Sequence, residues 1–168
     1  MAGKLGLARL ETLLENLDRE LDLNDSNVIY KEKVQNINAA KNLTAADCGT
    51  IILGVVGTQQ AVGTGFNLNL PAPERGLHYK FILAAPSIAA NANAAITITS
   101  TSNGSSAANL GIGSVTVNGA TTNVTSVADI VTFVHDAATC GDFAEVSCDG
   151  TNWIWNIYGD GTGSVTLA

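Results

Sequence analysis

The chain has 168 residues, with 8 Lys and Arg side chains against 15 Asp and Glu, and a formal net charge of −7. This length suits one domain with an appendage, and an acidic chain without a basic stripe is a poor partner for nucleic acid. No stretch approaches the ~20 consecutive apolar residues that span a bilayer, and the N-terminus lacks the apolar core of a signal peptide, so neither a nucleic-acid nor a membrane partner is expected.

The first predicted element is an amphipathic helix over residues 5–23. Leucines recur along it in steps of three and four residues, which is the a/d spacing of a coiled coil. They are Leu7, Leu10, Leu14, Leu17 and Leu21. A helix of this length is marginal by itself, so we expect its leucine edge to be covered by other copies of the chain, by a larger partner, or by the chain's own β domain. Leucine at both a and d positions leaves the number of helices open.

Residues 24–42 follow as a charged arm that contains neither Gly nor Pro. Single apolar residues are spaced along it, and we expect them to join the leucines in contacts with other copies or a partner. They include Val28, Tyr30, Val34 and Ile37. More than half of the charged side chains lie in residues 1–41. The change of composition predicts a boundary near residue 42, with 1–42 as an oligomerisation and anchoring segment and 43–168 as a β domain.

From residue 43 the hydrophobic period changes to two, which is the period of β-strands. Strands are predicted at 50–56, 66–70, 77–84, 95–100, 114–118, 121–125, 130–135, 143–148, 152–158 and 163–167. Asn118-Gly119 and Asp149-Gly150-Thr151 are turn sequences between paired strands. Residues 127–137 also have the spacing of a helix, although their β-branched residues favour a strand. Short strands with frequent turns predict a mainly β sandwich, jelly roll or Greek-key domain.

Residues with the spacing of a catalytic or metal-binding motif are not evident in the sequence. The histidines, His78 and His135, lie within strand-like runs, and no nucleophile and carboxylate are placed to complete a triad with either. The three cysteines, Cys48, Cys140 and Cys148, lack the close Cys or His pairs of a zinc site. We expect each to be a small buried thiol. These observations predict that the chain is not an enzyme and holds no metal or cofactor.

Two tryptophans, Trp153 and Trp155, are two residues apart and therefore share one face of a strand. Such a pair can form a surface platform that stacks on a sugar, or it can pack in the core or against another subunit. The apolar residues Ile157 and Tyr158 continue the strand, which favours packing.

Several short segments, taken in order, resemble a known family. They are Leu43-Thr44-Ala45-Ala46-Asp47-Cys48-Gly49-Thr50, Leu68-Asn69-Leu70-Pro71-Ala72-Pro73, Gly76-Leu77-His78-Tyr79-Lys80-Phe81, Gly141-Asp142-Phe143-Ala144-Glu145-Val146 and Asp149-Gly150-Thr151-Asn152-Trp153. Their order is similar to that of β modules in structural proteins of tailed bacteriophages, especially head decoration (cement) proteins and fibre-like appendages. The resemblance covers about residues 43–158.

This resemblance implies a binding role without a reaction. A decoration protein of this kind is a homotrimeric β sandwich or jelly roll that is made in the host cytoplasm and binds the outside of the virion capsid. There it contacts the major capsid protein and joins neighbouring capsomers. The first alternative is a fibre or spike module that recognises a host glycan, but a single β module without repeats favours decoration. The second alternative is a hydrolase fused to an oligomerisation helix, which would act through His78 or His135.

Overall fold

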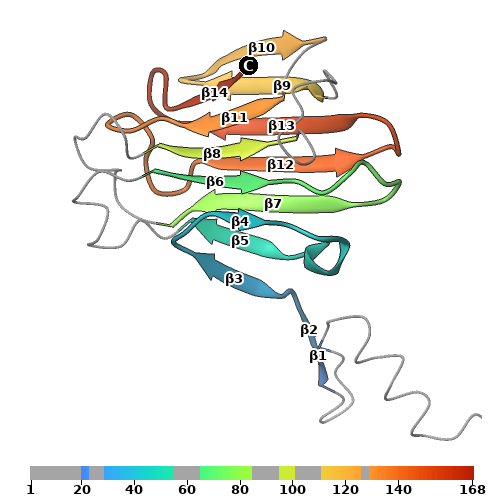
Figure 1. Cartoon of the computed structure of the whole chain (residues 1–168). Coiled ribbons are helices and arrows are strands. Elements are labelled where there is room, and N and C mark those ends of the chain that lie inside the picture. The colour runs from blue at the N-terminus through green and yellow to red at the C-terminus, as the bar shows by residue number, and fades with distance from the viewer. Residues whose placement is uncertain (1–19, 23–28, 55–64, 85–94, 101–110, 126–128) are drawn as a thin grey trace, which may run out of the picture. The chain divides into compact units, whose positions relative to one another are not determined.

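The computed structural model describes residues 20–22, 29–54, 65–84, 95–100, 111–125 and 129–168, and it is mainly β (Figure 1). Two compact units divide the chain, residues 1–34 and residues 35–168.

The N-terminal unit contains a short antiparallel hairpin. Strand β1 (Glu20–Asp22) pairs with β2 (Ile29–Lys31), and Leu21 lies opposite Tyr30. The helix expected over residues 5–23 is therefore wrong at its C-terminal end, while residues 5–19 lie outside the described part of the chain. The sequence between the two strands contains two asparagines, an aspartate and a serine, residue types that favour turns over helix interiors because their side chains compete for backbone hydrogen bonds.

The second unit contains two mixed β-sheets. The seven-stranded sheet has the order β10-β9-β13-β12-β7-β5-β3, and the five-stranded sheet has the order β14-β11-β8-β6-β4. Several neighbouring pairs are parallel, among them β9 with β13, β5 with β7, β4 with β6, and β6 with β8. From β3 to β9 the chain alternates between the two sheets. The seven-stranded sheet consists of β3 (Val34–Ile37), β5 (Ile51–Gly54), β7 (His78–Leu83), β9 (Gly111–Val117), β10 (Ala120–Val124), β12 (Phe143–Cys148) and β13 (Trp153–Gly159), and the five-stranded sheet of β4 (Lys41–Asn42), β6 (Phe66–Asn69), β8 (Ile96–Thr99), β11 (Ile130–Phe133) and β14 (Val165–Leu167).

Both sheets contribute one face to a single hydrophobic core. In β13 buried and exposed residues alternate along the whole strand, and β7 alternates in the same way. This arrangement is consistent with a β sandwich and confirms the prediction of a mainly β domain. Trp153 and Trp155 are 0% and 1% exposed, and the Trp153 ring lies 6.1 Å from that of Tyr79. The two tryptophans therefore pack in the core, and they do not form a surface platform for a sugar.

The predicted strands overlap those observed wherever the structure describes them. Residues 130–133 form a strand, as their β-branched side chains favour, whereas 126–128 lie outside the described residues. The turn between β9 and β10 has positive φ at both Asn118 (49°) and Gly119 (74°), which is the type I′ geometry that matches the twist of a hairpin.

The β domain begins before the composition break at residue 42. Residues 35–42 include most of β3 and all of β4, and each of these strands lies at an edge of one sheet. An edge strand is paired on one side only, so it tolerates polar and charged residues. Charge density in this region therefore reflects exposure at the edges of the sheets and does not separate an arm from the domain.

Candidate interaction surface

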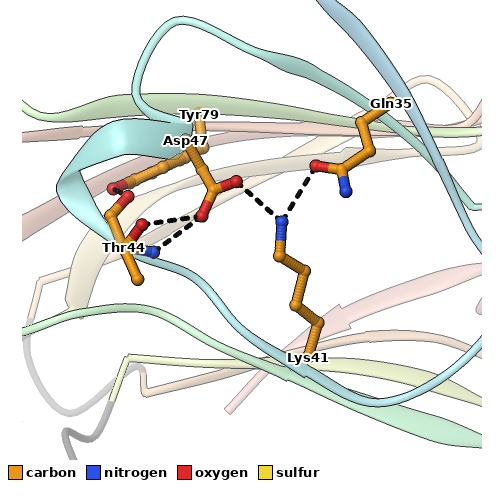
Figure 2. A network of polar contacts seen from close by, with 5 residues as sticks. All are labelled: Gln35, Lys41, Thr44, Asp47 and Tyr79. Carbon is orange, nitrogen blue, oxygen red and sulfur yellow. Dashed lines mark hydrogen bonds and ion pairs between the residues drawn. The ribbon is translucent and has the colours of Figure 1, made fainter.

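A network of polar contacts attaches the segment 35–47 to the β domain (Figure 2). The Lys41 ammonium donates to Gln35 Oε1 at 2.9 Å and to Asp47 Oδ1 at 2.6 Å. Asp47 Oδ2 accepts the backbone N–H of Thr44 at 2.9 Å and its hydroxyl at 3.0 Å. The Tyr79 hydroxyl, from β7, donates to the Thr44 carbonyl oxygen at 2.9 Å. The network thus joins β3, β4 and the short 3₁₀ helix Ala45–Asp47 to the central part of the sheet.

Two groups of this network have shifted pKa values. Burial raises the pKa of Asp47, but the hydrogen bonds from Lys41 and Thr44 and the Lys41 charge outweigh burial, so the net pKa lies below 3.8. Burial, and then nearby negative groups that include Asp47, raise the pKa of Tyr79 above its ordinary value. Asp47 is therefore ionised and Tyr79 protonated at neutral pH, which are the states that this network requires.

The outer side of the seven-stranded sheet carries an apolar surface with one ion pair, which we call the aromatic face. The Phe143 and Tyr158 rings stack with centroids 5.8 Å apart, and the Lys80 ammonium lies 5.3 Å from the Phe143 centroid. Lys80 also forms an ion pair with Glu145 at 2.6 Å. Strand register places these side chains on one face of β7, β12 and β13. The aromatic face consists of Lys80, Phe143, Glu145, Ile154 and Tyr158.

Two of these side chains are unusually exposed to solvent for large hydrophobic residues. Ile154 is 44% exposed and Tyr158 is 41% exposed. Single exposed apolar residues are common on protein surfaces. Here the stacked Phe143 and Tyr158 rings lie beside the Lys80–Glu145 ion pair, and Ile154 lies on its other side; aromatic side chains of this kind are enriched in protein contacts. The aromatic face is therefore the described surface best suited to bind another protein chain.

The outer side of the five-stranded sheet has a different chemistry. It presents threonines and asparagines from neighbouring strands, and Thr97 donates a hydrogen bond to Asn67 Oδ1. Asn69 Nδ2 donates to Asn42 Oδ1 at 2.7 Å. These short polar side chains satisfy one another across the strands, so this side is a weaker candidate for an apolar contact and provides control positions for experiments.

The structure places the predicted interface residues in several different environments. Leu7, Leu10, Leu14, Leu17 and Val28 lie outside the described residues. Leu21 and Tyr30 are paired in the backbone register of β1 and β2. Val34 is 54% exposed in β3, whereas Ile37 is 5% exposed and belongs to the core. The prediction that Ile37 contacts a partner is therefore wrong, because strand alternation turns this side chain into the core.

The sequence analysis missed both the aromatic face and a contact between a cysteine and a histidine. Ile154, Asn156 and Tyr158 alternate with the buried residues of β13, so the period-two pattern contained the signal for the outer face. Cys48 Sγ lies 3.5 Å from His78 Nδ1, and no sequence pattern predicts a contact between residues thirty positions apart. The expectation that every cysteine is buried is wrong, because Cys148 is buried but Cys48 is half-buried and Cys140 is exposed.

Searches of protein families, curated proteins and solved structures found no match to this chain. Within the described ranges, no three His, Cys, Asp or Glu side chains are grouped so that they could hold a metal ion. Among the same residues, no helix is long and apolar enough to cross a bilayer.

Proposed function

We propose that this chain is a structural protein of a tailed-bacteriophage virion, which binds the outside of the capsid as a homotrimer and joins neighbouring capsomers. Its role is binding without catalysis, and its partners are other copies of itself and the major capsid protein. Residues 1–34 hold the copies together, and the β domain provides the surface that contacts the shell. The jelly-roll or Greek-key assignment belongs to this proposal, since the family resemblance supports it.

One observation carries the proposal: the β domain has a core of its own. Its buried hydrophobic residues form one cluster to which strands of both sheets contribute. The five regularly spaced leucines lie in the other compact unit, residues 1–34. A compact domain joined to a leucine-rich segment is the organisation expected when that segment serves association between chains.

The physics of a capsid favours such an organisation. A trimer binds through three equal contacts, so contacts that are individually weak add through their effective concentration. Closed three-fold symmetry also prevents uncontrolled growth into filaments. The aromatic face supplies one apolar contact per copy, with the Lys80–Glu145 ion pair near its centre.

The alternative of a glycan-binding fibre module loses its main support. It depended on a surface platform of Trp153 and Trp155, and both residues are buried. We therefore carry only the capsid-binding proposal further.

Oligomeric state tests the first half of the proposal. Size-exclusion chromatography with light scattering should give a trimer for the full chain and a monomer for the double variant Leu10→Glu/Leu14→Glu. The matched control is Glu11→Gln/Glu15→Gln, which alters two neighbouring residues of the same segment but keeps all five leucines, and it should remain a trimer. A monomeric full chain, or a double leucine variant that is still trimeric, would contradict the assignment of residues 1–34.

Co-sedimentation with heads assembled from the cognate major capsid protein tests the second half. Tyr158→Arg places a charge in the aromatic face and should weaken binding at least about tenfold, because a buried unpaired charge in an interface costs several kcal/mol. Thr166→Arg, on the exposed outer side of the five-stranded sheet, should bind as the unchanged protein does. Equal binding by both variants would place the capsid contact elsewhere.

A further inference from the structure

We propose that Cys48 and His78 form a reactive thiol–imidazole pair, through which Cys48 exchanges with small-molecule disulfides. The proposal is argued from contacts within the β domain and concerns the free chain, because His78 shares the outer face of β7 with Lys80 of the aromatic face. Cys48 Sγ lies 3.5 Å from His78 Nδ1, which is within reach for a proton to pass from the thiol to the ring. Cys48 is half-buried and His78 is exposed, so a small reagent can approach the pair.

Backbone contacts hold the two residues together. The His78 N–H donates to Cys48 Sγ at 3.4 Å, and the Gly49 N–H donates to the His78 carbonyl oxygen at 3.0 Å. The first contact stabilises negative charge on the sulfur, since a backbone N–H is a suitable donor to a thiolate. The second fixes the chain that carries Cys48 against the start of β7. The pair therefore does not depend on two freely rotating side chains that meet by chance.

Glycine at position 49 makes this close approach possible. Its φ is +74°, a left-handed value that glycine adopts without the usual steric cost. A Cβ at this position would lie 3.4 Å from His78 Nε2, which is ordinary van der Waals contact. Glycine is therefore favoured here by the backbone conformation of the turn that brings Cys48 beside the ring.

The Gly76 carbonyl oxygen is a second hydrogen-bond acceptor near both residues. It lies 3.4 Å from His78 Nδ1 and 3.9 Å from Cys48 Sγ. When His78 Nδ1 is unprotonated, the Cys48 thiol can donate its proton to Nδ1. When Nδ1 is protonated, the ring can donate to the sulfur or to this carbonyl, so it keeps its orientation in both states.

Other ionisable groups also lie near the pair. The Asp47 carboxylate precedes Cys48, but it is bound to Lys41 and Thr44. Glu74, Tyr79 and Cys148 also lie in this region, since Glu74, Cys48 and Cys148 are among the groups that raise the pKa of Tyr79. Tyr79 is protonated at neutral pH and Cys148 is buried, so His78 is the group placed to accept the Cys48 proton.

The reaction is a thiol–disulfide exchange that needs no oxidant besides the disulfide. The Cys48 proton passes to His78 Nδ1, and the thiolate attacks one sulfur of the disulfide. A new S–S bond forms to Cys48 as the original S–S bond breaks. The other half of the reagent leaves as a thiolate and takes up a proton. The product is a mixed disulfide on Cys48, and one equivalent of small thiol is released for each chain.

The other two cysteines are internal controls. Cys140 is exposed, whereas Cys148 is buried and its Sγ accepts the Gly150 N–H at 3.4 Å. If exposure alone decided reactivity, Cys140 would react first. If the imidazole decides it, Cys48 reacts first although it is less exposed. Cys148 should stay unreactive as long as the domain is folded, so its labelling reports unfolding.

The experiment treats the full chain with the aromatic disulfide DTNB at pH 6.5, follows the released thiol by absorbance, and assigns the modified residue by peptide mass spectrometry. Cys48 should react first, and His78→Gln should slow Cys48 at least about tenfold, which is a conservative threshold because a general base typically contributes about 10²–10⁴-fold. The rate at Cys140 should not change in the variant. Glutathione disulfide should then add a single glutathione to the Cys140→Ser protein.

Two results would overturn the proposal. One is that Cys140 reacts before Cys48 in the unchanged protein, and the other is that His78→Gln leaves the Cys48 rate as it was while Cys148 stays unlabelled. If Cys148 becomes labelled in the variant, that variant has unfolded. The order in which Cys48 and Cys140 react in the unchanged protein then tests the proposal without the variant.

Discussion

The ion pair between Lys41 and Asp47 should contribute measurably to stability, and in a pH-dependent way. The side chains are 29% and 15% exposed, so their attraction is less screened than that of a surface pair. Asp47→Ala removes this pair together with two hydrogen bonds from Thr44. We expect a loss of about 1–3 kcal/mol in the free energy of unfolding, allowing for partial exposure. Lys41→Met, which keeps most of the aliphatic stem, should lose less.

A double-mutant cycle separates the pair from its surroundings. Urea unfolding of the unchanged protein, Asp47→Ala, Lys41→Met and the double variant should give a coupling energy of about 0.5–1.5 kcal/mol at pH 7. The folded-state pKa of Asp47 is lowered from 3.8. The stability that this carboxylate contributes is therefore complete above that value, and it is lost as pH falls through the lower, folded pKa.

The cycle repeated at pH 2.5 should accordingly show a smaller coupling energy than at pH 7, because below 3.8 the unfolded chain binds a proton at Asp47 and the contribution of the folded carboxylate decreases. Gln35→Ala, which removes only the second acceptor of Lys41, is a milder control and should leave the coupling in place. A coupling energy near zero at neutral pH, or one that does not decrease in acid, would refute the reasoning that the pair anchors residues 35–47.

Two further predictions concern packing in the seven-stranded sheet. Trp155→Ala should lower the free energy of unfolding by about 3–5 kcal/mol because it empties a buried site, whereas Ile154→Ala, at its exposed neighbour, should cost less than about 1 kcal/mol. Thermal or urea unfolding measures both losses, and similar losses would show that the two faces of β13 are wrongly assigned. Gly113→Ala should destabilise the domain by about 1–3 kcal/mol or more, because its Cβ would lie 2.2 Å from the Trp155 carbonyl oxygen on the neighbouring strand. Ser114→Ala, on the same strand, should be nearly neutral. An equal effect of the two substitutions in the same unfolding assay would contradict the register.

The family resemblance and the fold differ in how much of the chain they describe. The resemblance rests on segments between residues 43 and 158, but the β domain also needs residues 35–42 for an edge strand in each sheet. A truncation designed from the composition break would therefore remove β3 and β4 together with the N-terminal unit. A start at Gln35 keeps the Lys41–Asp47 network and Ile37, and it is the better boundary for separating the two units.

The sequence by itself determined where most strands lie, because burial on one face of a strand imposes a period of two that is visible in residues such as Phe66, Leu68 and Leu70. It also determined the hairpin turn at Asn118-Gly119, because positive φ at two successive residues restricts the residue types that fit. The predicted helix is wrong at Glu20–Asp22, because local helical spacing competes there with the pairing of these residues with Ile29–Lys31.

Only the tertiary structure decided which face of each strand meets the core, and which distant residues meet. Ile37 points inward and Val34 outward in the same strand, although both are β-branched residues in a polar stretch. Trp153 and Trp155 proved to be core residues because the five-stranded sheet covers their face, a contact that no local pattern encodes. Cys48 and His78 meet because β5 pairs with β7 and brings the preceding turn against the start of that strand. Such contacts depend on the pairing of strands far apart in the chain, and a periodic pattern carries no information about that pairing.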